Sequence, residues 1–293
     1  MSKKILIIGA SGRVGSEVIK SLEKNKKDIE IIYSTSNPKT KEKWEKEGKN
    51  SIVLDLNKPE LFESLLKGIQ RIFLLTGYSS EMLYQSKLLI DAAKKVGTEF
   101  IVHLGVYTSR YDFVPHFSWH DLIECYLKSS GIPYTNIHPN VITESVLVTN
   151  PSIKETHCIN TLCGDAKQGW VCTKDIGEVA ATVLIEGPEK HSGKDYYLSI
   201  EILTISEVAK IISDVSGQEM KVIDMNKEQQ EKMFSMIPSP GTRNYMESAL
   251  ITMDLTRNGK FKAQNELKDD VLTVVGRPGT KMKEWAMEYF SKK

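Results

Sequence analysis

Short apolar segments alternate with segments of helical periodicity along the first two thirds of this chain. The apolar segments are rich in β-branched residues, as expected of strands that are buried on both faces of a parallel sheet. Between them, apolar residues recur three and four positions apart, as at 13–24 and 79–96, which predicts amphipathic helices. The alternation predicts an α/β fold with a doubly wound parallel sheet. The expected strands lie at 5–8, 29–33, 51–54, 69–75, 100–104 and 132–137.

A glycine-rich turn joins the first expected strand to the first expected helix. Gly9 permits a tight reversal, Gly12 lets the backbone approach a pyrophosphate, and Gly15 lets helix and strand pack closely. The amides and the positive dipole end of the helix would then face the phosphates of a dinucleotide. The alternative is a purely structural turn. The expected cofactor-binding residues of this turn are Gly9, Ser11, Gly12, Arg13, Val14 and Gly15.

The end of the second expected strand bears on the choice of dinucleotide. An acidic residue there would bind both ribose hydroxyls of NAD and repel a 2′-phosphate, and the sequence has none. It has instead Thr35, Ser36 and, slightly later, Lys39, whose hydroxyl and ammonium groups suit the 2′-phosphate of NADP. The same residues are also typical of a plain turn. We predict NADP as the cofactor, with NAD as the alternative.

The other strand ends supply further side chains, because ligands of open α/β sheets bind outside the carboxyl ends of the strands. Asp55 would lie near the adenine, or would cap a helix expected near Pro59. Tyr78 and Tyr107 would point toward cofactor and substrate unless they pack beneath loops. The expected cofactor contacts here are Asp55, Leu56, Thr76, Gly77, Tyr78, Gly105, Val106, Pro139 and Asn140, and the expected substrate contacts are Tyr78, Tyr107, Asn140 and Trp170.

Three polar residues lie four apart on one face of the helix that follows the fifth strand: His116, His120 and Glu124. Two histidines at this spacing can chelate zinc, with Glu124 as a third ligand. The imidazoles could instead line a cofactor pocket, bind the nicotinamide ribose or donate a proton near neutral pH. They could also be ordinary polar residues at a helix start. We predict the pocket role, with His116 and His120 as catalytic residues, His120 also as a cofactor contact, and no metal.

Composition and charge describe an ordinary globular protein. The chain has 293 residues, of which 40% are hydrophobic and 26% charged, and its formal net charge is +1. No overall field therefore drives it onto nucleic acid or an anionic membrane. Without an apolar signal region or spanning segment, the expected compartment is the cytoplasm, and the expected partner is a small-molecule substrate of a monomer or homodimer. The four cysteines, which have no metal-binding spacing, are Cys125, Cys158, Cys163 and Cys172.

The pattern changes after the sixth expected strand. We predict that residues 1–141 form the dinucleotide-binding core, to which 169–186 return. Residues 142–168 and 187–293 would form a smaller lobe that covers the substrate. From about residue 218 the chain becomes polar and methionine-rich, which suits an adaptable pocket wall or filler in a small helical lobe.

Taken together, these segments resemble the NmrA-like group of atypical short-chain dehydrogenases/reductases over nearly the whole chain. The group includes quinone and triphenylmethane reductases and NADPH-sensing regulators. The resemblance implies a Rossmann domain with strand order 3-2-1-4-5-6-7 and a smaller C-terminal lobe that forms the substrate cleft. Besides the glycine turn, it is carried by Ser129-Ser130-Gly131-Ile132-Pro133-Tyr134-Thr135, Asp175-Ile176-Gly177-Glu178-Val179-Ala180, Leu203-Thr204 and Gly276-Arg277-Pro278 with Trp285.

Two departures from the group's pattern affect the expected function. The Tyr-x-x-x-Lys pair of the wider superfamily is replaced by His116 and His120, and Ser36 stands where many members carry an arginine that grips the 2′-phosphate. The resemblance implies an NADPH-dependent reductase of a quinone-like or other conjugated small molecule, because quinone reduction needs little from the protein beyond orientation. The competing hypothesis is a non-catalytic NADP(H) sensor, which the loss of the Tyr-Lys pair explains more directly.

Overall fold

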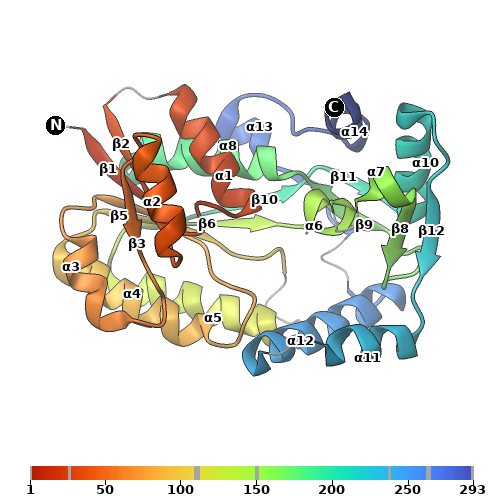
Figure 1. Ribbon diagram of the computed structural model, residues 1–293, viewed down its shortest axis with the longest axis horizontal. Coiled ribbons are helices and arrows are strands. Elements are labelled where there is room, and N and C mark those ends of the chain that lie inside the picture. Colours follow the sequence, from red (N-terminus) through yellow and green to blue (C-terminus); the bar gives the residue numbers. More distant parts are fainter. Residues whose placement is uncertain are drawn as a thin grey trace.

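The computed structural model describes residues 2–25, 28–108, 113–148, 152–236, 239–261 and 265–291. Its centre is an eight-stranded sheet with strands β1 (Lys3–Ile7), β2 (Ile29–Thr35), β3 (Ser51–Val53), β4 (Arg71–Leu74), β5 (Phe100–Leu104), β6 (Tyr134–Pro139), β10 (Lys194–Ser199) and β13 (Lys268–Asp269). The strands are ordered β13-β10-β6-β5-β4-β1-β2-β3 (Figure 1). All neighbours are parallel except β13, which pairs antiparallel with β10. The α/β fold and its strand order 3-2-1-4-5-6-7 are thus confirmed, with β13 as an added edge strand.

Helices cover both faces of this sheet (Figure 1). One face carries α1 (Arg13–Lys24), α8 (Thr173–Glu186) and α13 (Asp270–Val275), and the other carries α3 (Phe62–Leu66), α4 (Met82–Val96) and α5 (Pro115–Ser130). Side chains of β1 and of the next residue alternate between the two faces: Ile5 and Ile7 belong to the first apolar core, and Leu6 and Ile8 to the second. Short helices between these elements are α2 (Pro38–Lys46), η1 (Pro59–Leu61) and α9 (Pro188–His191).

Helices α1 and α8 approach each other closely. A Cβ atom on Gly177 of α8 would lie 2.6 Å from the carbonyl carbon of Glu17 on α1, so this contact requires glycine. Helix α8 begins at Thr173, and its N-cap residue is Cys172. Asp175 is a buried residue of its first turn.

Beyond β6 the chain builds two smaller sheets and a separate apolar core. Trp170, Ile212 and Trp285 are buried in that core. The small sheets contain β7 (Val141–Ile142), β9 (Gln168–Val171) and β11 (Glu201–Leu203), and β8 (Cys158–Thr161) with β12 (Lys221–Asp224). The helices of this region are α6 (Thr143–Leu147), α7 (Ile153–Thr156), α10 (Ile205–Ser216), α11 (Lys227–Ser235), α12 (Pro240–Arg257) and α14 (Met282–Ser291).

The chain passes between the two groups of strands more than once. Residues 168–171 form β9 in the three-stranded sheet, whereas residues 194–199 form β10 beside β6 in the large sheet. The division into a core of 1–141 with 169–186 and a lobe of 142–168 with 187–293 stays a prediction. What the structure adds is that β10 and β13 extend the large sheet from the C-terminal half.

Two features expected from composition can be compared with the structure. All four cysteines are free thiols, and Cys163 and Cys172 are buried. Among the described residues, no helix combines the length and the apolar character that a membrane span requires.

Candidate functional site

The glycine turn between β1 and α1 has the geometry that its spacing predicts. Gly9 has a φ of +72°, in the left-handed region that favours glycine, and its carbonyl oxygen accepts a 2.8 Å hydrogen bond from the Gly12 amide. A Cβ atom on Gly15 would collide with the same carbonyl oxygen. Gly12 is the N-cap residue of α1, and no described side chain caps this helix or places an acid in its first turn. The amino end of α1 therefore presents its first amides and its dipole to an anion.

The other predicted residues of this turn differ in what they can contact. Ser11 is exposed, whereas the Val14 side chain is buried in the core, so only the backbone of Val14 could reach a cofactor. The Arg13 guanidinium donates a 2.7 Å hydrogen bond from Nη2 to the carbonyl oxygen of Val148. Arg13 would have to leave Val148 to contact a phosphate.

The end of β2 forms a turn that leaves two of the predicted side chains exposed. Thr35 Oγ1 accepts a hydrogen bond from the Asn37 amide at 3.1 Å, and Asn37 caps α2 by accepting from the Lys39 amide at 2.9 Å. The side chains of Ser36 and Lys39 are exposed. The turn and the phosphate-binding interpretations are therefore compatible here.

The predicted cofactor contacts at the ends of β3 and β4 have varied environments. Asp55 Oδ1 accepts a 3.0 Å hydrogen bond from the Asn57 amide, and the N-cap residue of η1 is Lys58, so the expected capping by Asp55 is not what the structure has. Leu56 packs against the second apolar core. Thr76 is half-buried and Gly77 is exposed.

A cavity of about 520 Å³ lies beyond the carboxyl ends of β5 and β6. Five of the predicted site residues line it: Val106, Tyr107, His116, Pro139 and Asn140. A second hollow of about 640 Å³ borders α1 and α14, and its lining includes none of the predicted residues. The first cavity is therefore the candidate functional site.

His116, near the amino end of α5, is held by Ser248 of α12. Ser248 Oγ accepts a hydrogen bond from the His116 amide at 2.9 Å and lies 2.8 Å from its Nδ1. The Ser248 hydroxyl group has one proton that it can donate to Nδ1, and in that arrangement the ring carries its own proton on Nε2. Burial lowers the pKa of His116 to about 4. The ring is neutral at pH 7, so it offers an N–H donor and does not titrate near neutral pH as the sequence predicted.

His120, one turn further along α5, is buried and is not among the described residues that line the cavity. Its ring centroid lies 5.6 Å from that of His103 on β5. Nδ1 of His120 and Nε2 of His103 have no hydrogen-bond partner within the described ranges. Burial lowers the pKa of both rings, that of His103 to about 3. His120 is thus a buried, neutral ring, and its predicted contact with a ribose stays a prediction.

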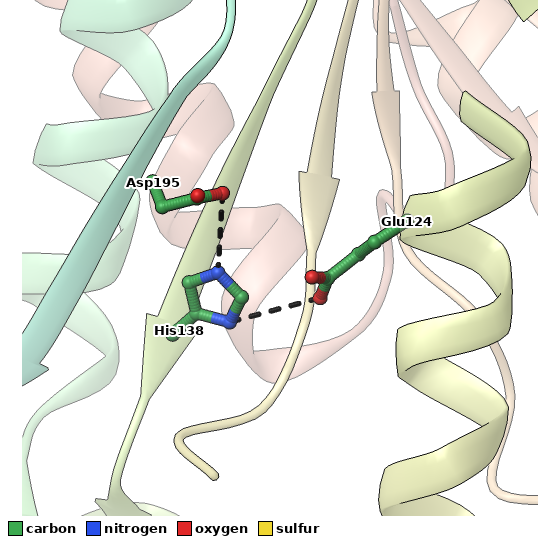
Figure 2. Close-up of side chains that lie close together, drawn as sticks. All are labelled: Glu124, His138 and Asp195. Atoms are coloured by element: carbon green, nitrogen blue, oxygen red, sulfur yellow. Dashed lines mark hydrogen bonds and ion pairs between the residues drawn. The ribbon is translucent and has the colours of Figure 1, made fainter. Parts of the chain in front are cut away.

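Glu124 does not complete a triad with His116 and His120, because it turns toward the sheet. His138 of β6 lies between Glu124 and Asp195 of β10 (Figure 2). Its Nδ1 is 3.7 Å from Glu124 Oε1 and donates a 3.1 Å hydrogen bond to the Val106 carbonyl oxygen, and its Nε2 is 3.5 Å from Asp195 Oδ1. Burial alone would lower the pKa of His138, but the contact with Asp195 and the two negative charges outweigh it and raise the pKa.

Glu124, His138 and Asp195 are also residue types that bind metal ions, and one ligand atom from each lies within 4.8 Å of the others. The sequence predicted no metal site and gave no signal for this group, because its members come from α5, β6 and β10. The two ring nitrogens of His138 face different carboxylates. A single cation would therefore displace one of the ion pairs.

The two predicted tyrosines have different environments. Tyr107 is buried, lines the cavity, and lies with its hydroxyl 3.3 Å from Glu266 Oε2; burial raises its pKa. Tyr78 is 62% exposed and contacts Tyr245 of α12 edge-on, with ring centroids 5.3 Å apart. Tyr245 in turn lies 4.8 Å from the His116 ring. Tyr107 is thus part of the cavity wall, whereas Tyr78 lies at its periphery on the α12 side.

Asn140 and Trp170, both predicted as substrate contacts, are engaged elsewhere. The Asn140 amide group donates to Ser199 Oγ at 3.2 Å and accepts from the Val141 amide at 3.0 Å, which fixes the path from β6 to β7. Trp170 is buried in the separate apolar core and donates from Nε1 to the Leu203 carbonyl oxygen at 3.1 Å. Asn140 still borders the cavity, but Trp170 is not among its described lining residues.

Much of the cavity wall was missed by sequence reasoning. It comes from segments that have no motif and that are far apart along the chain, so only the fold brings them together. Met225, from the methionine-rich stretch, is the part for which a signal existed. The main apolar members that were missed are Phe117, Val146, Leu162, Ile205, Ala249 and Met253.

Two of the segments that carry the family resemblance meet in space. Arg277 Nη2 donates to Asp175 Oδ1 at 2.7 Å, and Arg277 Nε donates to Glu178 Oε2 at 2.9 Å. Asp175 also accepts from the amide and the hydroxyl of Thr280 at 2.6 and 2.8 Å. These polar residues therefore tie the loop before α14 to α8.

Comparison with known proteins agrees with this architecture. A model of the NmrA-like family matches residues 1–286. The chain is 25% identical to quinone oxidoreductase 2 of Escherichia coli (strain K12), with 98% of this chain and 99% of that protein covered. It is 23% identical to the NAD(P)H azoreductase of Xenophilus azovorans, with 96% of each covered.

Solved structures share the fold. The triphenylmethane reductase of Citrobacter sp., complexed with NADP(H), superposes with a TM-score of 0.79 at 23% identity, with 98% of this chain and 99% of that chain covered. The Escherichia coli NADPH-dependent quinone oxidoreductase complexed with NADPH gives 0.78 at 23% identity, with the same coverage. Because the family model matches nearly the whole chain, this protein belongs to the NmrA-like family.

Proposed function

We propose that this protein is an NAD(P)H-dependent oxidoreductase that transfers hydride to a quinone-like or other conjugated small molecule. The observation that carries the proposal is the 520 Å³ cavity at the ends of β5 and β6, on the same edge of the sheet as the glycine turn. Three strand spacings separate β1 from β6, which is about 14 Å, a length over which a dinucleotide can extend. The relatives named as azoreductase and quinone oxidoreductase support the same activity.

The residues at the strand ends fit a dinucleotide. The first amides of α1 would bind the pyrophosphate, and the exposed Ser36 and Lys39 side chains would bind a 2′-phosphate, which favours NADPH over NADH. The remaining predicted contacts, from Asp55 and Leu56 through Thr76 and Gly77, follow the same edge. The bound nicotinamide would supply the hydride.

The cavity wall suits a flat acceptor. Phe117, Tyr107, Met225 and Met253 provide aromatic and thioether surface. His116, neutral and with its proton on Nε2, would donate a hydrogen bond to the acceptor oxygen on which negative charge develops. The reduced anion would then take its proton from solvent, since the lowered pKa leaves His116 no extra proton to give.

The test is NADPH oxidation by the purified protein with a panel of quinones, azo dyes and triphenylmethane dyes, in parallel with NADH. Turnover with NADPH is expected, and Lys39→Ala should raise KM for NADPH while leaving KM for NADH unchanged. Tight dinucleotide binding without turnover of any acceptor would overturn the reductase and support the non-catalytic sensor. If the protein binds neither dinucleotide, both the reductase and the sensor hypotheses are wrong.

A further inference from the structure

We propose that His138 is a positioning residue, held as an imidazolium between Glu124 and Asp195, that fixes the Val106 carbonyl group at the wall of the cavity (Figure 2). The proposal rests on the proposed function only in taking this cavity as the ligand site. The charge state of the ring can be measured whether or not the protein is a reductase.

Both ring nitrogens of His138 face groups that accept hydrogen bonds. Nδ1 lies 3.1 Å from the Val106 carbonyl oxygen, and Nε2 lies 3.5 Å from Asp195 Oδ1. The same Asp195 oxygen accepts a 2.8 Å hydrogen bond from Asn136 Nδ2, as an ionised carboxylate does. A neutral imidazole has one N–H and can serve only one of these acceptors, whereas an imidazolium serves both. Both acceptors are therefore served only by the doubly protonated ring.

The surroundings of His138 supply negative charge. Glu124 Oε1, 3.7 Å from Nδ1, is a second counter-charge, and its side chain is only 20% exposed. The nearby rings of His103 and His120 are neutral, because burial lowers their pKa. The Tyr197 ring stacks on His138 with centroids 4.6 Å apart and an interplanar angle of 15°. The titratable groups facing His138 are thus Glu124 and His120 from α5, His103 from β5, and Asp195 and Tyr197 from β10.

Glycine at position 105 leaves space for the side chains of Glu124 and His138. A Cβ atom on Gly105 would lie 2.7 Å from Glu124 Oε1 and 3.2 Å from His138 Nδ1. The sequence assigned Gly105 to the cofactor, and the structure gives it a second reason, the close approach of the carboxylate and the imidazole.

The segment that His138 holds is part of the cavity wall. The Gly105 amide donates to the Ile137 carbonyl oxygen at 2.9 Å and the Tyr107 amide donates to that of Pro139 at 3.0 Å, so the segment is tied to β6 on both sides of Val106. His138 binds the carbonyl group between these two ties, and both Val106 and Tyr107 line the cavity. Loss of the ring charge would release either Val106 or Asp195.

The expected pH dependence follows from the sign of the pKa shift. The pKa of His138 is raised, so the ring keeps its proton to a higher pH than an ordinary histidine and loses it as pH rises through that higher value. Affinity for a cavity ligand should therefore fall on the alkaline side, by about fivefold, as for the loss of one hydrogen bond.

The decisive experiment is a ¹⁵N NMR titration of the histidine side chains in the protein without added ligand, with His138→Gln to assign its signals. At pH 7 both nitrogens of His138 should be protonated, and the ring should titrate above the ordinary range, while His103, His116 and His120 are neutral. A neutral His138 at pH 7 would overturn the proposal. A shift of the His138 signals on addition of Zn²⁺ alone would also overturn it, in favour of a metal site.

Kinetics with 1,4-naphthoquinone and NADPH test the positioning role. KM for the quinone should rise on the alkaline side with little change in kcat, and Asp195→Asn should move this rise to lower pH. His138→Gln, which cannot titrate, should abolish it. Asp214→Asn is the matched control, because Asp214 lies on α10 with its side chain 65% exposed and paired with Lys210. A pH profile that Asp195→Asn leaves unchanged would refute the role, even if the reductase activity is present.

Discussion

Buried histidines near one cavity have pKa values shifted in opposite directions. His116 and His120 on α5 are enclosed without a carboxylate at their rings, so burial lowers their pKa. His138 on β6 is buried as deeply, but it lies between Glu124 and Asp195 and its pKa is raised. The comparison teaches that burial alone does not decide the charge of a histidine, because two nearby carboxylates can reverse its effect.

The largest expected effect is the loss of folding stability on acidification, which depends on the neutral histidines. His116, His120 and His103 have folded-state pKa values below the ordinary 6.5. Below that pH the unfolded chain therefore binds more protons than the folded chain. Their contribution to stability is fully present above pH 6.5 and is lost as pH falls toward 4, by about 1.4 kcal/mol per pH unit for each ring. Urea unfolding between pH 7 and 5 measures this slope, and His120→Leu should reduce it. An unchanged slope in that variant would contradict the neutral state of His120.

The next largest effect is expected from replacing single histidines, which should distinguish the ion-paired His138 from the neutral His120. His138→Leu leaves Glu124 and Asp195 facing each other without a cation, which should lower the free energy of unfolding by roughly 3 kcal/mol at pH 7. His120→Leu removes a ring whose Nδ1 has no partner among the described residues, so the change should stay within about 1 kcal/mol. Denaturant unfolding of both variants is the measurement. Equal losses would show that the carboxylates do not distinguish the two sites.

Filling the space beneath His138 should have a smaller effect. Gly105→Ala places a methyl group against Glu124 Oε1 and should cost about 1–2 kcal/mol of stability. Gly77→Ala is the control, because a Cβ atom there meets nothing within 4 Å. Thermal unfolding of the two alanine variants should show a lowered Tm only for position 105. The proposed close packing is wrong if both variants keep the parent Tm.

The smallest loss of stability is expected on replacing Asp195, the most exposed member of the group Glu124, His138 and Asp195. The Asp195 side chain is 47% exposed, so solvent screens its charge. Asp195→Asn should lower stability by about 0.5 kcal/mol, and the difference from the parent should shrink as salt is raised. Paired unfolding curves at low and high ionic strength check this. A loss that salt does not change would point to a packing defect at this position.

Local patterns predicted the elements and the glycine turn. The apolar segments of β1 and β5 and the spacing of α1 follow from the nearest neighbours in sequence, as do the roles of Gly9 and Gly15. Local patterns did not predict which distant residues a polar side chain contacts in the folded chain. Asp175, for example, binds Arg277 and Thr280 about a hundred residues away.

The sequence by itself determined the α/β class and the backbone of the glycine turn, because periodicity and glycine geometry act over a few residues. The order of the parallel strands was expected only from the family resemblance. Only the tertiary structure decided which polar side chains meet. Helical spacing put Glu124 with His116 and His120, but the packing of α5 against β6 turned it toward His138. The charge of a buried imidazole depends on what lies within a few ångströms of it in space, and that information is not contained in any local pattern.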